Sequence, residues 1–329
     1  MSLMIFQILL SLTVLLAVVS SAPSLSLLQV NIGNLDGVLP HTECPTIPYK
    51  GACCSLTQEK ILNHNITRIS PDIVSLLEVF DSEYCKERNY KPTNKDEVCW
   101  DYQNPDRPYQ QARRILGDKY TILCDAVHHF DCVGLKTSRI SVEECPDGKL
   151  CIGGMKSLPH PASCNIVGSS WITSVSKVHV TIDYDTGSPF DLTVVISHPA
   201  QGVEKKNDAC RLDEYKQTFE TLPDSSHTLI LGDFQMDMFR LNSTFFFSSA
   251  GYWRSQVGRF GDTSLKFMGI SLTQIPPLPT YVDTVTLDYI IGNLWKSSKC
   301  TVYGVSPGTM RIDHPWNAMD HQGLHCLVS

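Results

Sequence analysis

LILGDFQMD, residues 229–237, joins a short apolar run to an acidic side chain at Asp233. A short continuous apolar run bounded by polar residues is typical of a strand that is buried on both faces. In α/β proteins the side chains at the carboxyl ends of such strands build the binding site. The stretch therefore predicts a buried strand that presents Asp233 at its end, and the same pattern recurs along the chain.

Polar side chains stand at the ends of five further apolar runs. A polar residue at a strand end is more often a turn or cap than a ligand, so each position alone is a weak signal. Together they supply carboxylates, an amide and imidazoles, which suit a divalent metal and general acid–base work on a phosphodiester. Oxygen ligands favour Mg²⁺ or Mn²⁺ over Zn²⁺. The positions are Asn31 after LLQV, Glu78 after IVSLL, His198 after TVVIS, Asp288 before YII and Asp320-His321 before the last run.

The alternation of short β-type runs with helical segments predicts the α/β class with mixed sheets. Helical spacing covers 59–70 and 208–222, and in the second segment Leu212, Tyr215, Phe219 and Leu222 form the apolar stripe. We expect the cysteine- and proline-rich segments 85–111 and 137–170 to be surface loops. No repeat or linker divides residues 25–329, which indicates one large domain. Expected strands are 26–32, 72–80, 126–136, 177–185, 191–199, 226–234, 284–292, 300–305 and 323–329.

The blocks that carry these residues resemble, in order and context, the endonuclease/exonuclease/phosphatase superfamily, whose fold is that of deoxyribonuclease I. The resemblance implies a four-layer α/β sandwich over residues 25–329, with two mixed sheets packed face to face and helices outside. The matching blocks are QVNIGN (29–34), PDIVSLLEVF (71–80), HFDCVGLK (129–136), TVVISHPA (193–200), LILGDFQMD (229–237), LDYIIGN (287–293) and MDHQGLHCLV (319–328).

The same resemblance implies a role for each metal-binding position. Glu78 is the central ligand, with Asn31 and Asp320 beside it, and the metal is Mg²⁺ or Mn²⁺. A structural Ca²⁺ is a further alternative. Asp233 would orient or deprotonate the attacking water. Gln235 stands where the family has asparagine, so its amide would reach the water or the phosphate on a longer arm.

The histidines would complete the chemistry. The resemblance implies that His321, held by Asp288, and His198 stabilise the phosphorane and protonate the leaving oxygen. An imidazole titrates near neutrality and can therefore donate or accept this proton. His129 falls near the place where the family's secreted deoxyribonucleases carry a carboxylate that partners the first catalytic histidine, with the acids Asp131 and Asp125 close by.

Three functions follow from these residues. The favoured one is a phosphodiesterase of the deoxyribonuclease I type, acting on DNA as a monomer. However, Phe80 occupies the position of an arginine that reaches the DNA in the secreted deoxyribonucleases, and Met319 replaces the serine before the terminal Asp-His. The second is therefore a phospholipase C acting on sphingomyelin, or a phosphoinositide phosphatase. The third is a non-catalytic secreted binding or effector protein.

Residues 1–22 predict a secretory signal peptide. Their apolar run, Leu9 to Val19, is followed by the small residues Ser20-Ser21-Ala22. A membrane anchor is the alternative, but the run is shorter than the ~20 residues that span a bilayer. Secretion permits disulfides and glycosylation. We expect Asn65 and Asn242 to carry glycans, because each begins an Asn-X-Thr sequon.

The composition limits the cysteine chemistry and the partners. Thirteen cysteines leave at least one outside any intramolecular pair. We expect Cys300 to pair with Cys326 and Cys145 with Cys151. Twenty-seven basic and 34 acidic side chains give a net charge of −7. The overall charge therefore attracts neither nucleic acid nor an anionic membrane, and a local site must hold any phosphate.

Overall fold

The structure is a computed structural model of the chain. It describes part of the 329 residues. The described residues are 24–32, 56–87, 95, 99–100, 102, 110–127, 130–166, 175–183, 189–202, 204–222, 227–237, 247–256, 266–267, 286–293, 298–303, 321 and 323–329.

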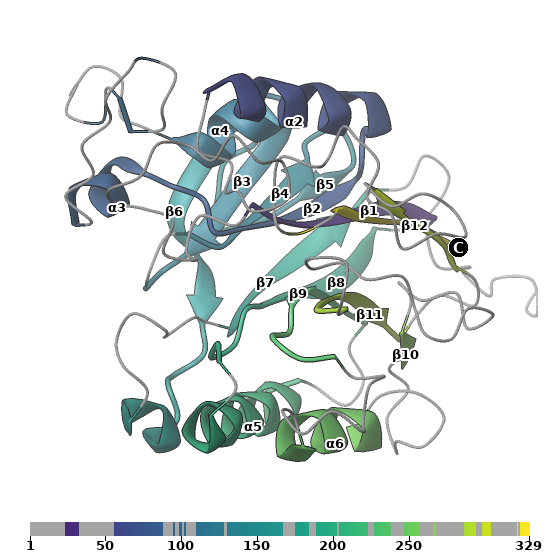
Figure 1. The fold of residues 1–329 in the computed structure, drawn as a ribbon. Helices are drawn as coiled ribbons and strands as arrows, with labels where there is room; N and C mark the ends of the chain where they lie inside the picture. The colour runs from purple at the N-terminus through teal and green to yellow at the C-terminus, as the bar shows by residue number, and fades with distance from the viewer. Residues whose placement is uncertain are drawn as a thin grey trace, which may run out of the picture.

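The described strands form one continuous curled sheet with two halves (Figure 1). In the first half the strand order is β3-β4-β2-β1-β13-β12, and in the second it is β10-β11-β9-β8-β7 with β5 beside β7. The first half contains β1 (Leu25–Asn31), β2 (Ile73–Leu77), β3 (Tyr120–Asp125), β4 (Cys132–Lys136), β12 (Ser298–Tyr303) and β13 (Gly323–Val328). The second contains β5 (Ile140–Ser141), β7 (Val175–Ile182), β8 (Phe190–Ser197), β9 (Thr228–Asp233), β10 (Lys266–Phe267) and β11 (Asp288–Gly292).

Strand β6 (Leu150–Ser157) joins the two halves. It pairs in parallel with β3 and, at its other end, antiparallel with β7. The halves face each other across a shared apolar core, to which Leu27 and Ile73 contribute from one side and Val194 and Leu231 from the other. Because strands buried on both faces need a second covering layer, the outer faces are closed by helices.

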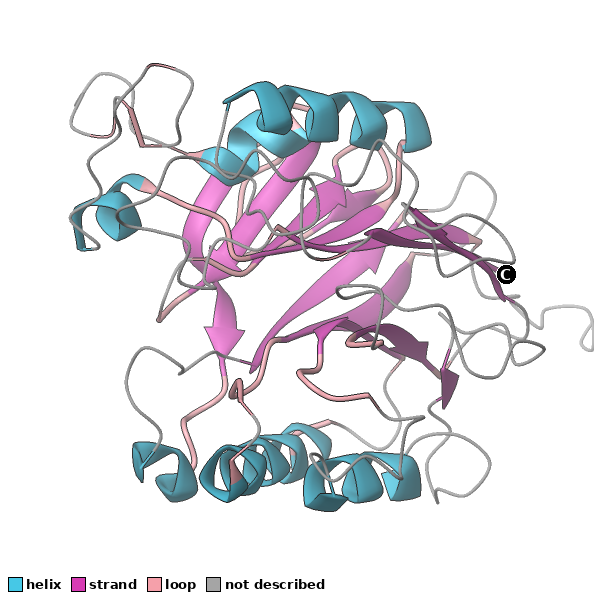
Figure 2. Cartoon of the chain, viewed as in Figure 1, coloured by secondary structure: helices cyan, strands magenta, loops and turns pink. Residues whose placement is uncertain are grey.

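The helices lie outside the two halves (Figures 1 and 2). On the first half are α2 (Leu56–Ile69) and α4 (Gln111–Leu116), and below the second half are α5 (Lys205–Glu220) and α6 (Phe247–Gln256). The remaining short elements are α3 (Ser82–Glu87) and η2 (Ala162–Ile166). Helix, sheet, sheet and helix make four layers, which confirms the predicted α/β sandwich.

The expected surface loops were partly wrong. Segment 137–170 holds β5, β6 and η2, and segment 85–111 ends at the start of α4. The sequence of β6 has the pattern of a loop, but it forms a strand because it pairs with both halves of the sheet. Strand pairing can override a weak local pattern. The expected strand 126–136 is also shorter, since the Val127 N–H donates to the Asp125 carboxylate and the chain turns before β4.

Helix α5 packs most of the predicted apolar stripe against the core, since Phe219 and Leu222 lie against the same cluster as Tyr215. Tyr215 is fully buried against Trp253, at 5.1 Å between ring centroids, but Leu212 is only half-buried. The polar side chains of Arg211 and Glu214 are buried as well, which the stripe did not predict. Buried charged groups require hydrogen-bond partners, and both side chains find them in the loop that follows β8.

Five disulfides join the described cysteines. Two of them, Cys145–Cys151 and Cys300–Cys326, are the pairs expected from the sequence. The other three are Cys85–Cys99, Cys124–Cys132 and Cys164–Cys210. Cys44, Cys53 and Cys54 lie outside the described residues.

The glycosylation and targeting predictions meet the structure only in part. Asn65 lies within α2 and is 4% exposed, so a glycan there would require the side chain to leave its packed position. Asn242 and residues 1–22 lie outside the described residues. Of the helices that are described, none combines the length and the apolar character that a bilayer crossing requires.

Candidate active site

Four of the predicted side chains meet because parallel strands end at the same edge. Asn31 is the last residue of β1 and Glu78 follows β2, with which β1 pairs in parallel. His198 follows β8, and Asp233 is the last residue of β9, its parallel neighbour. Since the two halves of the sheet face each other, their carboxyl ends converge at one place.

Antiparallel neighbours deliver three more side chains from their amino ends. Asp288 begins β11 and lies opposite Asp233 in the strand register. Asp131 directly precedes β4, and His321 lies two residues before Gly323, the first residue of β13. An antiparallel strand starts where its partner ends, so these residues reach the same edge as the four above.

The centre of the group bridges the two halves of the sheet. The Asn31 amide Nδ2 donates to Glu78 Oε1 at 2.9 Å and to Asp233 Oδ2 at 3.1 Å. All three side chains are at most 3% exposed. Asn31 therefore ties a carboxylate from the first half to one from the second half.

One histidine–carboxylate pair lies on the Glu78 side. His198 Nδ1 contacts Asp131 Oδ1 at 2.9 Å, and its Nε2 lies 3.5 Å from Glu78 Oε1. The ring is completely buried, and Nε2 has no hydrogen-bond partner among the described residues. A buried polar atom without a partner is costly unless a ligand serves it. Nε2 is therefore an atom of the site that a bound ligand could serve.

A second pair lies on the Asp233 side. His321 Nδ1 contacts Asp288 Oδ2 at 2.9 Å, and its Nε2 lies 3.5 Å from Asp233 Oδ2. The other Asp288 oxygen accepts a hydrogen bond of 3.2 Å from Gln29 Nε2. In both pairs one nitrogen is held by a carboxylate, and the other is directed toward the centre of the group.

Burial and mutual charge shift the titration of this group. Burial raises the pKa of Asp131 to about 6, against the lowering effect of His198. Burial likewise raises the pKa of Asp233 to about 6, while His321 lowers it and Asp288 raises it. For His198, burial lowers the pKa, but Asp131 and Glu78 outweigh this and raise it well above 6.5. The site therefore concentrates negative charge that a cation would stabilise.

No protein-family model matches the sequence, and no curated protein sequence matches it. Solved structures match the fold. The endonuclease/exonuclease/phosphatase from Beutenbergia cavernae DSM 12333 has a TM-score of 0.55 at 14% identity, over 93% of this chain and 72% of that chain. An endonuclease/exonuclease/phosphatase family protein from Bacteroides thetaiotaomicron has a TM-score of 0.52 at 13% identity, over 93% and 98%. D. rerio TDP2, complexed with a single strand DNA product, has a TM-score of 0.51 at 14% identity, over 94% and 100%.

This chain has the endonuclease/exonuclease/phosphatase fold. Both matches cover 93% of this chain, and the fold is the one that the resemblance of the sequence blocks implied. At these identities the likeness establishes the fold, and the site must be judged on its own geometry.

Backbone strain marks two residues of the site in this endonuclease/exonuclease/phosphatase fold. Glu78 has φ of 60° and Gln235 has φ of 53°, a left-handed conformation that is uncommon outside glycine. The Gln235 N–H and Nε2 both donate to the Asp233 carboxylate, at 2.7 and 2.8 Å. Non-glycine residues held in this region cluster at functional sites. Gln235 is therefore placed to orient Asp233.

Sequence reasoning missed Gln29, gave Asp131 only as one of two acids close to His129, and named two residues that lie outside the described part. Asp131 contacts His198 Nδ1, and Gln29 donates to Asp288, the carboxylate that holds His321. Both stand in the quoted blocks HFDCVGLK and QVNIGN, but spacing alone does not tell which acid faces the histidine. Asp320 and His129 are not described, so their predicted roles stay predictions.

Gly232 controls how closely β8 and β9 approach at the site. A Cβ at this position would overlap the backbone carbonyl oxygen of Ser197, the residue before His198. We expect Gly232→Ala to lower the free energy of unfolding by about 1–3 kcal/mol, as overpacking does. Thermal or urea unfolding would measure it. Gly251→Ala is the matched control, because nothing lies within 4 Å of its added Cβ on α6; equal stability of the two variants would contradict the clash.

Proposed function

We propose that this protein is a secreted, divalent-metal-dependent phosphodiesterase, with DNA as the favoured substrate and a deoxyribonuclease I-like endonuclease as the specific activity. The observation that carries the proposal is the convergence of two histidine–carboxylate pairs on one buried group. His198 with Asp131 and His321 with Asp288 direct their second nitrogens toward Glu78 and Asp233. Two imidazoles that face two carboxylates suit proton transfer at a phosphorus centre.

The donor set fits a hard divalent cation. Glu78, His198 and Asp233 offer ligand atoms within 4.8 Å of one another, and the group is rich in oxygen. We assign the metal to Glu78, with Asn31 and Asp320 as further ligands, and Mg²⁺ or Mn²⁺ suits these oxygens. Bound there, the metal would polarise a phosphoryl oxygen and stabilise its developing charge. Neighbouring buried carboxylates repel one another, which gives the group a second reason to bind a cation.

The remaining residues would move and hold protons. Asp233, oriented by Gln235, would accept a proton from the attacking water. His198, with its pKa raised, would be charged at neutral pH, stabilise the phosphorane and donate from Nε2 to the leaving oxygen. Asp288 fixes the tautomer of His321, which would stabilise the same charge from the opposite side.

Two observations bear on the substrate. The matching TDP2 structure contains a single strand DNA product, which supports nucleic acid. Phe80 is 1% exposed and its N–H donates to Gln111 Oε1, so this position cannot extend toward a DNA backbone as an arginine would. The second observation removes one contact to DNA, and a phospholipid phosphodiester is the alternative substrate. The chemistry at the phosphorus centre would be the same for both.

Secretion rests on the cysteine chemistry and on residues 1–22. Five disulfides join described cysteines, and disulfides persist mainly in oxidising compartments. Detection of the protein in the medium of expressing cells, with a mature amino terminus near residue 23, would support this part of the proposal. Retention of the protein inside the cells would contradict it.

The substrate test compares three phosphodiesters with one purified protein. Mg²⁺-dependent release from plasmid DNA, sphingomyelin and a soluble phosphodiester is measured side by side, with His198→Ala as the inactive reference. Cleavage of DNA that His198→Ala abolishes supports the proposal. Cleavage of sphingomyelin without DNA replaces the substrate, and equal activity of the two proteins rejects the mechanism. A folded protein with no activity on any of the three would favour the non-catalytic effector.

Gln29 provides a test of the His321 side of the site. Gln29→Met removes the amide that donates to Asp288 and keeps a similar volume. We expect kcat/KM to fall about tenfold, because groups that orient ligands and catalytic side chains typically contribute 10–100-fold. Steady-state kinetics on the active substrate would measure it. Gln29→Glu should lose more, since it places a second carboxylate against Asp288; the reverse order would contradict the contact.

A further inference from the structure

Helix α5 grips the loop that carries His198. The backbone N–H of Ala200, two residues after His198, donates to Glu214 Oε2 at 2.8 Å. The carbonyl oxygens of Ala200 and Gly202 accept from Arg211 Nη1, at 2.6 and 3.2 Å. The peptide groups on both sides of Ala200 are therefore held by two buried side chains of one helix.

The Arg211 side chain is itself held by groups on α5 and α6. Arg211 Nε donates to Ser249 Oγ of α6 at 3.2 Å, and Arg211 Nη2 lies 3.6 Å from Asp208. The disulfide Cys164–Cys210 fastens η2 to the same stretch of α5. A side chain whose rotamer is held on several sides keeps the groups that it binds in a fixed position.

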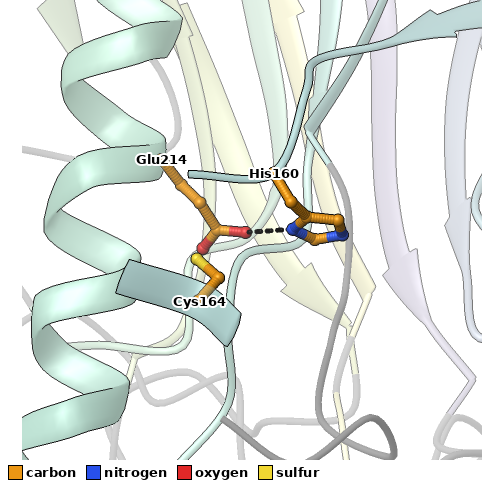
Figure 3. Close-up of side chains that lie close together, drawn as sticks. All are labelled: His160, Cys164 and Glu214. Carbon is orange, nitrogen blue, oxygen red and sulfur yellow. Dashed lines mark ion pairs between the residues drawn. The ribbon is translucent and has the colours of Figure 1, made fainter. Parts of the chain in front are cut away.

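Figure 3 shows the other face of Glu214, where His160 and Cys164 lie beside it. Three such side chains invite a metal-site interpretation. The Cys164 sulfur is bonded to Cys210, so it is not a thiolate ligand, and His160 Nδ1 lies 3.9 Å from Glu214 Oε1. A histidine and one carboxylate are too few for a protein metal site. Among the described residues this group therefore lacks the ligands of a metal site, and Glu214 is left as the member that contacts the loop.

The chemistry of Glu214 permits a conservative substitution. Burial raises the pKa of Glu214 to about 8, although the Ala200 N–H and Arg211 lower it. Near neutral pH the side chain is thus largely a neutral acid that accepts one hydrogen bond. Glutamine has the same length and keeps an acceptor oxygen, whereas methionine has a similar length and none.

We propose that Glu214 is a positioning residue, which sets the direction of the His198 imidazole through the Ala200 peptide; this rests on the proposed catalytic role of His198. His198 Nδ1 meets both Asp131 oxygens, at 2.9 and 3.1 Å, so a small shift of the loop would break a two-point contact. Displacements of about 1 Å at a reacting group can cost 10²-fold in rate.

The kinetic test compares Glu214→Met with Glu214→Gln. We expect Glu214→Met to lower kcat by roughly 10- to 100-fold with KM changed little, and Glu214→Gln to restore most of that loss. Glu220→Met is the control, because Glu220 is an exposed glutamate on the same helix. If Glu214→Met does not fold, Glu214→Asp replaces it: the shorter arm withdraws the acceptor from Ala200 and keeps the carboxyl group, so kcat should again fall below that of Glu214→Gln.

A second readout needs no activity. The Nδ1 proton of His198 is observed by NMR in the wild type and in each folded variant. A shift or loss of this signal in Glu214→Met, reversed in Glu214→Gln, supports the positioning role even if no substrate is cleaved, in which case only the proposed function fails. An unchanged signal together with unchanged kcat in folded Glu214→Met overturns the positioning role and leaves the proposed function intact.

Discussion

Replacement of His198 by alanine should lower kcat by about 10²- to 10⁴-fold, the contribution of a positioned general acid or base. The expectation follows from one atom. His198 Nε2 is buried, lies 3.5 Å from Glu78 Oε1 and has no hydrogen-bond partner among the described residues, while Asp131 holds Nδ1. The measurement is the steady-state rate with saturating Mg²⁺ and the substrate that the three-substrate comparison identifies.

The control for this variant is His227→Ala. His227 is exposed and stacks on Phe190 at 4.4 Å between ring centroids, at the amino ends of β8 and β9. It should retain full activity. Asp131→Asn should lose much of what His198→Ala loses, and the double variant should lose little more, since the two residues act as a unit. Additive losses in the double variant would show that Asp131 does not act through His198.

Substitution of Glu78 by glutamine is expected to lower activity at fixed Mg²⁺ by about 10²-fold or more. A metal that stabilises transition-state charge contributes several kcal/mol, and each 1.36 kcal/mol is tenfold in rate. Glutamine keeps the shape and the acceptor for Asn31 Nδ2, but it removes the charge that we assign to the central ligand. A Mg²⁺ titration of the rate should show a weaker apparent affinity, with partial recovery at high Mg²⁺.

The same variant should stay folded without metal. Glu78 is 3% exposed among the carboxylates of Asp131 and Asp233, so removal of one charge relieves repulsion. Thermal unfolding in EDTA should therefore show a Tm that is at least that of the wild type. A clear loss of stability, with a normal response to Mg²⁺, would make Glu78 a structural residue. Glu144→Gln is the control, because Glu144 is exposed.

The strands that carry the site were largely predictable, whereas their partners were not. Apolar runs that end in Asn31, Glu78, His198 and Asp233 indicate buried strands in any context, because continuous apolar sequence has no stable exposed conformation. Strand β6 was not predicted, because most of its residues are partly exposed and its two ends pair with different strands, β3 and β7. Its strand character comes from the neighbouring strands.

Helix α5 shows the same limit of sequence-based prediction, here for its buried side chains. Its length followed from helical spacing, but its buried polar face did not, because Arg211 and Glu214 look like ordinary surface residues in a sequence. They are buried because the loop after β8 presents backbone groups that need partners. A signal available beforehand was their spacing of three residues, which places them on one helix face.

The amino-acid sequence alone determined which segments are buried strands, and it placed acids, amides and imidazoles at their ends. Tertiary structure decided which of these groups meet: Asp131 pairs with His198, and Gln29 contacts Asp288. Which residues share a face of a helix or strand depends on the period of that element, and this period can be read from the sequence alone. Pairing between residues 67 or 259 positions apart depends on strand order and register, which only the folded sheet fixes.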